Sequence, residues 1–226
     1  MNLLRTAKKR LVRGLRPASL PQTRSTRPTS DSYGFDRGRP IDRYYIDRFF
    51  AAHAADMRGD VLEVQEWLYG KGAAGEVTGR HVLDIDPANP DATVVADLSA
   101  ADDVPAESFD CILLPQTLQF IFEAGAAIRH CHRMLRPGGV LLATVPGTAR
   151  VDPELYASDY WRFTPASCER LLAGPFGGGA SVTSFGNALA CGGFIAGLSV
   201  EEFSASELDP VDSFFPLILG LRARKA

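Results

Sequence analysis

Two carboxylates stand in apolar runs of the sequence, where they could hold a ligand. Glu63 lies in the run VLEV (61–64), and Asp97 closes the run TVVADL (93–98). Burying a carboxylate without partners is costly, so Glu63 should either accept hydrogen bonds from a ligand or cap backbone amides of the next turn. Asp97 suits an exocyclic amine of adenine, with the N–H of Leu98 donating to a ring nitrogen. An Asp that caps a helix starting two residues later fits the local sequence equally well.

Two glutamines follow a further apolar run. Gln116 and Gln119 come directly after FDCILL (109–114), which would place both amide side chains beside the same cleft. Neither side chain titrates in a range useful for proton transfer. No general base is therefore evident, and the sequence leaves the catalytic residue unassigned.

A sheet is needed to bring these residues together. Apolar runs typical of buried strands alternate with segments of helical periodicity. Each strand is apolar along its whole length, which indicates a parallel sheet covered on both faces. Ligands of such sheets bind beyond the carboxyl ends of the strands. Helices are expected at 41–57, 124–135 and 165–176, and strands at 61–64, 93–98, 109–118, 140–147, 181–185 and 216–224.

Charge divides the 226 residues unevenly. Residues 1–39 carry ten Lys or Arg against two Asp, about +8, so the net charge of -3 leaves about -11 on the remainder. An acidic body argues against nucleic acid as the partner of the folded part. We expect a flexible basic N-terminal arm over 1–32 and one domain over 33–226. The arm is interpreted either as solvated chain or as a contact for a membrane surface or partner, its first 16 residues forming a short amphipathic helix.

The remaining composition points to a cytoplasmic protein. The four cysteines lie in apolar settings without CxxC spacing, which indicates buried, reduced thiols rather than disulfides. His130 and His132 flank Cys131, but side chains two apart point to different faces of a helix, so no metal site is expected. No apolar run approaches the ~18 residues of a membrane span.

The order of these segments resembles the class I S-adenosylmethionine-dependent methyltransferases. The superfamily resemblance rests on FDCILLPQTLQ (109–119) and LRPGGVLL (135–142). GFDRGRPIDRYY (34–45) and DYWRFT (159–164) resemble a small bacterial branch associated with sugar or natural-product pathways. The resemblance runs from Tyr33 to the C-terminus. It implies a Rossmann-like, doubly wound α/β fold with a seven-stranded sheet, mostly parallel with the last strand antiparallel.

The resemblance also implies roles for particular residues around S-adenosylmethionine. Glu63 and Gln65 would lie near the methionine part of this cofactor. The acid that binds the ribose would be Asp84, with Asp86 as the alternative. Adenine would be held by Asp97 and Leu98, and the cleft near the sulfonium would be lined by Gln116.

The segment QEWLYGKG (65–72) departs from the family pattern. The family expects Glu-x-Gly after the first strand, but here the first glycine comes only at Gly70. Glycine permits positive φ and close backbone approach. Gln65 would bring a side chain against the amino-acid tail of the cofactor, Glu66 a second negative charge near its carboxylate, and Trp67 added bulk. All three oppose cofactor binding unless the loop is remodelled.

The substrate side is expected to come from two segments. One is the N-terminal helix, with Arg43 and Tyr44. The other is the loop after the fifth strand, with Tyr160, Trp161 and Arg162. Aromatic rings with Arg suit a sugar, an aromatic ring or an acidic small molecule. Core or lid packing is the competing interpretation for the aromatic side chains. A salt bridge between neighbouring Asp36 and Arg37 would pin the N-terminal segment over the cleft.

Two functions follow from these observations. The first is methyl transfer from S-adenosylmethionine to oxygen or nitrogen of a small molecule, a sugar or secondary metabolite. A missing base does not exclude it, because alignment of a reactive methyl sulfonium can suffice. The second is a methyltransferase-like protein with altered or lost cofactor binding. Such a protein would catalyse a cyclisation or rearrangement, or serve as a partner subunit.

Overall fold

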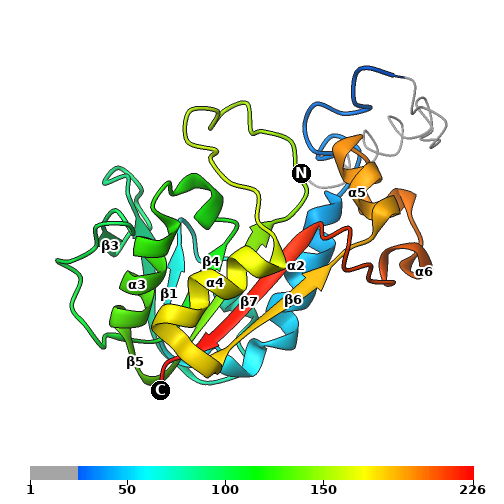
Figure 1. Ribbon diagram of the computed structural model, residues 1–226. Coiled ribbons are helices and arrows are strands. Elements are labelled where there is room, and N and C mark those ends of the chain that lie inside the picture. Colours follow the sequence, from blue (N-terminus) through cyan, green and yellow to red (C-terminus); the bar gives the residue numbers. More distant parts are fainter. Residues whose placement is uncertain (1–24) are drawn as a thin grey trace. The chain divides into compact units, whose positions relative to one another are not determined.

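The computed structural model describes residues 25–226 (Figure 1). They form two compact units. One unit contains residues 25–45, Thr148–Arg150 and Ser184–Ile218, and the other contains Ile46–Gly147, Val151–Thr183 and Leu219–Ala226. The amphipathic helix expected over the first 16 residues lies outside the described part of the chain. The boundary expected at residue 32 stays a prediction.

A seven-stranded sheet organises the chain, with strand order β3-β2-β1-β4-β5-β7-β6. The pairs β1–β2, β2–β3, β1–β4 and β4–β5 are parallel. The last strand runs antiparallel, and the arrows of β6 and β7 point in opposite directions in Figure 1. This confirms the predicted fold class. The strands are β1 (Gly59–Val64), β2 (Val77–Asp84), β3 (Val94–Val95), β4 (Phe109–Pro115), β5 (Leu135–Pro146), β6 (Ala180–Phe185) and β7 (Ile218–Arg224).

Burial explains the central position of β4 and β5. From Cys111 to Leu114 every residue of β4 is buried, and the same holds from Val140 to Pro146 of β5. Strands with apolar side chains on both faces are most stable where both faces of the sheet are covered. The strand predicted at 140–147 begins earlier, because Leu135 already pairs with Phe109 across the irregularity that contains the RPGG segment. By contrast, β3 is only two residues long, shorter than the predicted 93–98.

Three helices cover the sheet where the sequence predicts them. In Figure 1, α3 (Ala124–Met134) and α4 (Pro165–Phe176) lie in front of the sheet. The bounds of α4 match the prediction because Thr164 and Ser167 form a capping box around Pro165 in the first turn. The helix expected over 41–57 divides into α2 (Ile41–Ala52) and the 3-10 turn η2 (Ala54–Asp56).

The alternation of strands and helices indicated by the sequence does not hold between β1 and β4. The β1–β2 connection contains a single 3-10 turn, η3 (Tyr69–Gly72), and the β2–β3 and β3–β4 connections contain no helix. The helix considered near Ser99 is a turn in which Ala100 N donates to Asp97 O over 2.9 Å. Turns and irregular backbone occupy these connections in place of helices. Both faces of β1 are nevertheless covered, because Val61 and Leu62 point to opposite faces and neither is exposed.

The core of the second unit is a continuous apolar cluster. Ile112 and Leu114 of β4, Leu141 of β5 and Ile128 of α3 all belong to it, and none of these side chains is exposed. On the other side of the sheet, the ring of Phe49 in α2 packs against Gly220 of β7. These contacts fix the strands whose carboxyl ends carry the predicted site.

The first unit is built around a buried ion pair that the sequence did not indicate. Arg37 is fully buried and its guanidinium donates to Glu202, with Nε at 3.0 Å from Oε2. Asp36 instead accepts a hydrogen bond from Ser30 Oγ. The neighbouring salt bridge expected between Asp36 and Arg37 is thus replaced, because the two side chains find partners elsewhere in the unit. Two short helical elements, α5 (Ala188–Ile195) and α6 (Ala205–Leu208), and the turn η6 (Val200–Glu202) complete it.

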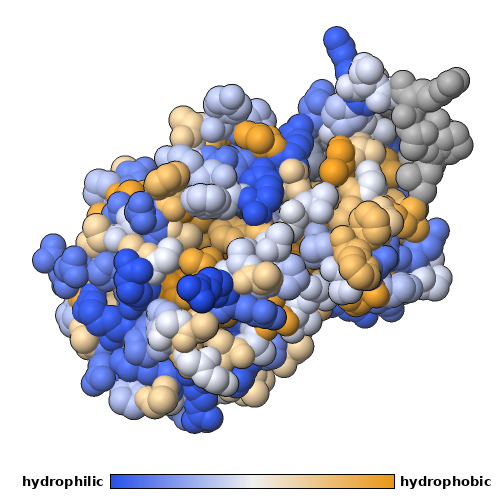
Figure 2. All heavy atoms as spheres, viewed as in Figure 1, coloured by the Kyte–Doolittle hydropathy of each residue, from blue (hydrophilic) through white to orange (hydrophobic). Residues whose placement is uncertain are grey.

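The surface of the first unit carries exposed apolar side chains. Figure 2 shows apolar residues gathered over α5. Ile195, Val211 and Phe214 are each at least half exposed. Within residues 25–226, no helix is long and apolar enough to cross a membrane.

Candidate functional site

The strand order brings one set of predicted residues to a single edge of the sheet. Because β3, β2, β1 and β4 are parallel neighbours, their carboxyl ends meet at the same edge. The residues at or just beyond these ends are Glu63, Gln65, Asp84, Asp97, Leu98 and Gln116. We call this region the carboxyl edge. The tertiary structure also shows what each side chain already contacts there.

Glu63 is fully buried and engages the loop that follows β1. Its carboxylate accepts hydrogen bonds from the backbone N–H groups of Leu68, Tyr69 and Gly70 at 3.0, 2.8 and 3.0 Å. Burial raises the pKa of Glu63, while these three amides oppose that rise by stabilising the charged form. These three hydrogen bonds support the interpretation of Glu63 as a cap for the backbone amides of the next turn.

The loop after β1 keeps a glycine-like backbone without the glycine. Gln65 has a φ of 72°, a left-handed conformation that L side chains adopt at a cost. Its side chain is exposed, whereas Trp67 folds back over Gly70 and lies beneath the guanidinium of Arg80 at 5.8 Å. Tyr69 stacks on Phe50 of α2 with ring centroids 4.3 Å apart. These contacts hold the loop in place without any ligand.

Asp84 ends β2 and is bound by a residue that sequence reasoning missed. Asn89 Nδ2 donates to Asp84 Oδ2 over 2.7 Å and to the carbonyl oxygen of Gln65 over 2.8 Å. The amide of Asn89 thereby bridges the loops that follow β1 and β2. Asp86, the alternative acid, is exposed and accepts from Ala88 N. The signal available was the sequence Asn89-Pro90, a common turn pair directly after the second strand.

Asp97 and Leu98 follow the short strand β3. Asp97 is exposed, and its Oδ1 accepts from both the backbone N and the hydroxyl of Ser99 at 2.8 and 2.7 Å. The carboxylate therefore does cap the following turn. Leu98 is 4% exposed and belongs to the apolar core, so its backbone is held in place.

Gln116 and Gln119 bring two unsatisfied polar atoms to the end of β4. Gln116 has a φ of 49°, and its backbone N donates to Thr144 O of β5 at 2.9 Å. Gln119, in the turn η4 (Leu118–Phe120), is 5% exposed and donates through Nε2 to Gln116 O. Nε2 of Gln116 and Oε1 of Gln119 are buried and have no hydrogen-bond partner. One is a donor and the other an acceptor, and a buried polar atom without a partner is unusual in a protein.

The loop after β5 is attached to η4 through an aromatic cluster. The backbone N–H groups of Tyr160 and Trp161 both donate to Gln119 O, and Trp161 Nε1 donates to Ile121 O over 3.1 Å. Phe122 stacks on Trp161 at 5.6 Å and meets Tyr160 edge-on at 5.3 Å. All three rings of this cluster are more than a third exposed. Phe122 was not among the predicted site residues.

Arg162 is neutralised within this loop. Its guanidinium makes two hydrogen bonds to the carboxylate of Asp159, at 2.6 and 2.8 Å, and this contact lowers the pKa of Asp159. Asp152 N donates to the same carboxylate and secures the far end of the loop. Arg162 thus acts as a brace for the loop in this structure.

Arg43 and Tyr44, predicted on the substrate side, belong to the first unit. Tyr44 donates its hydroxyl to Asp209 at 2.5 Å. Arg43 lies beside Asp42, its Nε 4.0 Å from that carboxylate. Neighbouring Tyr45 is buried and donates to Leu208 O. Packing within the first unit therefore accounts for the contacts seen for these tyrosines.

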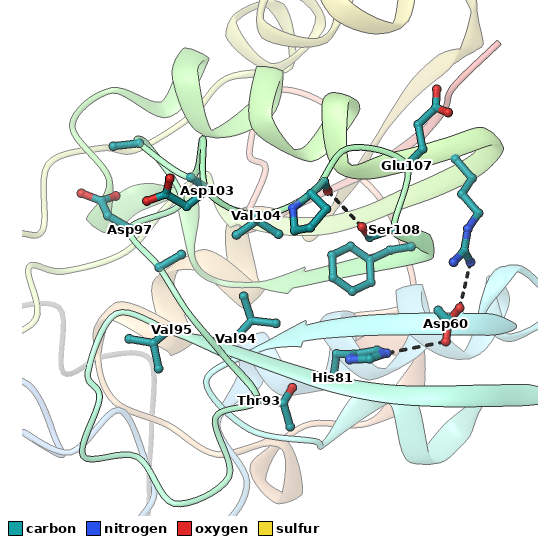
Figure 3. Close-up of a pocket in the computed structure, with 16 residues that line it drawn as sticks. Asp60, His81, Thr93, Val94, Val95, Asp97, Asp103, Val104, Glu107 and Ser108 are labelled. Carbon is teal, nitrogen blue, oxygen red and sulfur yellow. Dashed lines mark hydrogen bonds and ion pairs between the residues drawn. The ribbon is translucent and has the colours of Figure 1, made fainter.

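A cavity of about 690 Å³ lies between β2, β3 and the connection that follows β3. In Figure 3, Asp60 and His81 face each other at one end, and Asp97 and Asp103 lie at the other. Arg136 Nη1 donates to Asp60 Oδ2 over 2.9 Å and also to Asp110 Oδ2. These residues form a hydrogen-bond network near the amino ends of the strands. Only Asp97 belongs to both the cavity and the carboxyl edge.

Metal and thiol chemistry find no support among the described residues. No group of three His, Cys, Asp or Glu residues within 25–226 is arranged to hold a metal ion. All four cysteines are buried, and burial raises the pKa of Cys131 and Cys168 to about 12. These thiols stay protonated near neutral pH.

Comparison with known proteins agrees with the observed fold. Residues 74–143 match the family model of the methyltransferase domain. An S-adenosylmethionine-dependent methyltransferase from Archaeoglobus fulgidus is similar with a TM-score of 0.53 at 10% identity, covering 81% of this chain and 94% of that chain. For one from Mesorhizobium loti the TM-score is 0.51 at 15% identity, covering 82% and 100%. No curated protein matches the sequence significantly.

A further structural neighbour contains the cofactor. Phosphoethanolamine N-methyltransferase 2 from Haemonchus contortus, in complex with S-adenosyl-L-methionine, has a TM-score of 0.52 at 14% identity, covering 80% of this chain and 52% of that one. These likenesses show that the chain has the Rossmann-like fold of the methyltransferases, with a match to the methyltransferase-domain model over residues 74–143.

Proposed function

We propose that this protein binds S-adenosylmethionine at the carboxyl edge and transfers its methyl group to a small molecule. The observation that carries the proposal is the pair of carboxylates on neighbouring strand ends, Asp84 on β2 and Asp97 beyond β3. Both remain partly or fully exposed, and Leu98 N follows Asp97 directly. This is the arrangement expected for holding a ribose and an adenine ring.

The nucleoside half of the cofactor fits these residues, and the amino-acid half does not. The second oxygen of Asp97 makes none of the hydrogen bonds seen around its partner Oδ1, so it can accept from an amine. Glu63, in contrast, is enclosed and fully used by the loop amides. The bound cofactor would supply an electrophilic methyl sulfonium; the residues described here would only position it.

The acceptor side is supported by the end of β4 and the loop above it. The unpaired amide atoms of Gln116 and Gln119 offer one donor and one acceptor. Phe122, just after η4, and Tyr160 and Trp161 in the loop attached to η4 offer exposed aromatic faces. Aromatic faces with neutral hydrogen-bonding groups suit a sugar or another ring-containing metabolite. Methylation at oxygen or nitrogen would then depend on alignment of the acceptor rather than on a titrating base.

A second candidate function is favoured by the state of Glu63 and Asn89. Both side chains are satisfied within the chain around the place where the amino-acid tail would lie. A methyltransferase-like protein with altered or lost cofactor binding would show such contacts. It would catalyse a different reaction in the cleft, such as a cyclisation or rearrangement, or serve as a partner subunit. A cytoplasmic location and a partner or membrane contact of the basic arm belong to the proposal in either case.

Titration with S-adenosylmethionine and S-adenosylhomocysteine separates the two candidates. Calorimetry and thermal shift should both detect binding, and Asp97→Ala should weaken it by about tenfold, equivalent to about 1.4 kcal/mol. Because Asp97 also caps a turn, Ser99→Ala is the matched control: it removes one capping bond but keeps the carboxylate. If millimolar ligand produces no heat and no thermal shift, the methyl-transfer proposal is excluded and the second candidate remains.

A further inference from the structure

The notch between the carboxyl ends of β1 and β2 is closed by the chain itself. The Asn89 side chain spans it, donating to the Gln65 carbonyl on one side and to the Asp84 carboxylate on the other. Asn89 Oδ1 in turn accepts from Asp91 N at 3.0 Å, which fixes the orientation of the amide. We call this bridge the Asn89 strap. Both hydrogens of the Asn89 amide group thereby have acceptors in the chain, and no ligand is needed to satisfy them.

The loop after β1 has almost no backbone donors left for an anion. Between Gln65 and Gly70, five of the six backbone N–H groups already have acceptors in the chain: Leu83 O, Val64 O and the two oxygens of Glu63. An N–H that is already paired gains little by turning to a ligand. The turn η3 is too short to provide the helix dipole that favours an anion.

We infer that this site selects the adenosine half of an S-adenosyl ligand and does not recognise the amino-acid tail. The inference rests on the proposed function, because it concerns the same carboxyl edge. Asp97 keeps an unused carboxylate oxygen for the nucleoside, and Asp84, which already accepts from Asn89 and from Asp86 N, offers its remaining lone pairs. The strap and the occupied amides remove the contacts that a tail carboxylate needs. The ligand class is therefore 5′-substituted adenosine, with or without the aminocarboxypropyl group.

Paired titrations with S-adenosylhomocysteine and 5′-methylthioadenosine test this directly. The two compounds share the nucleoside and the thioether, and only the first carries the tail. Calorimetry on the full chain should give dissociation constants within about threefold of each other, which corresponds to under about 0.7 kcal/mol. Binding of S-adenosylhomocysteine that is stronger by more than this factor would overturn the inference while leaving the proposed function intact. If neither compound binds, the proposed function itself fails.

Substitution of the strap provides the second arm. Asn89→Ala removes both hydrogen bonds of the strap, so the notch opens. A ligand that carries the amino-acid tail should then bind more tightly. The affinity ratio of S-adenosylhomocysteine to 5′-methylthioadenosine should then rise by about fivefold or more. Asp91→Ala is the matched control, because it alters an exposed side chain of the same loop and keeps the Asp91 N–H that orients Asn89. A ratio that stays equal in Asn89→Ala and Asp91→Ala would overturn the role given to the strap.

Discussion

Glu63 holds a carboxylate in a fully buried position because three backbone N–H groups surround it. The same residue was expected either at a ligand or at a cap, and local sequence did not separate the two. The distinction depends on where the chain turns after β1. Here the turn brings Leu68 to Gly70 back onto the carboxylate, so the residue stabilises the loop that borders the proposed site.

Replacing this carboxylate should destabilise the protein. In Glu63→Gln one acceptor oxygen becomes an NH2 group, which leaves at least one buried backbone N–H unsatisfied. We expect a loss of about 1–3 kcal/mol in the free energy of unfolding, measured by denaturant titration. Glu66→Gln is the control, since its side chain is exposed and the change should stay within about 0.5 kcal/mol. Equal stability of the two variants would contradict the capping role.

The Asp159–Arg162 pair should make the loop after β5 sensitive to acid. Hydrogen bonds from Arg162 lower the pKa of Asp159 below its usual 3.8, so the charged form is favoured in the folded protein. The stabilisation is therefore complete above pH 3.8 and lost as the pH falls through the lowered pKa. Trp161 fluorescence in a Trp67→Phe background reports the change. The acid transition should disappear in Asp159→Asn and persist in Glu154→Gln; its persistence in both would refute the assignment.

At the scale of elements, α2 packs closely against β7 because Gly220 has no side chain. A Cβ at this position would lie 2.3 Å from Phe49 Cδ2, and Phe49 is buried. The requirement is one of close approach, because Gly220 has no positive φ. Sequence reasoning identified both elements, but the glycine in ILGLRAR carried no sign that a helix from an earlier part of the chain packs on it.

Two alanine substitutions should have opposite effects on stability. Gly220→Ala must displace the Phe49 ring, and we expect a loss of about 1–3 kcal/mol. Gly192→Ala lies within α5, where a new Cβ meets no atom within 4 Å, and should add about 0.5–1 kcal/mol through helix propensity. Thermal unfolding of both variants checks the pair. A loss of stability in Gly192→Ala, or none in Gly220→Ala, would count against the packing described.

At the scale of the whole molecule, the helical cover of the sheet is uneven. The connections before and after β5 contain α3 and α4, whereas those linking β1, β2, β3 and β4 contain only the short turn η3. The proposed nucleoside site lies on this thinly covered side, together with the cavity in Figure 3. Segments with few buried contacts open most readily, so ligand binding is expected to order this side.

Hydrogen exchange should reveal this asymmetry. Backbone amides of β4 and β5, which lie in the buried centre of the sheet, should exchange far more slowly than those between Ile85 and Ala100. Addition of S-adenosylhomocysteine should slow exchange around Asp84 and Asp97 and leave α4 unchanged. Mass spectrometry of peptides from both regions measures the difference. Uniform protection across the sheet, before and after ligand, would be inconsistent with the described architecture.

Local sequence patterns were enough to predict the fold class, the start and end of α4, and the strand ends that would carry polar residues. These features are local: apolar runs define strands, and the Thr164–Pro165 signal defines a helix start. The same patterns also located the anomaly at QEWLYGKG. The role of this segment depends on long-range contacts, because the partners of Glu63 and the Asn89 strap arise where separate loops meet.

The same limit explains the corrections. Arg37 pairs with Glu202, which is 165 residues away, and not with its neighbour Asp36, because a buried charge takes the partner that the fold brings within reach. The turns that replace helices between β1 and β4 are likewise held by contacts between loops, such as those of Asn89 with Gln65 and Asp84. Local pattern thus fixed which residues reach the carboxyl edge, while long-range contact fixed which of them remain available to a ligand.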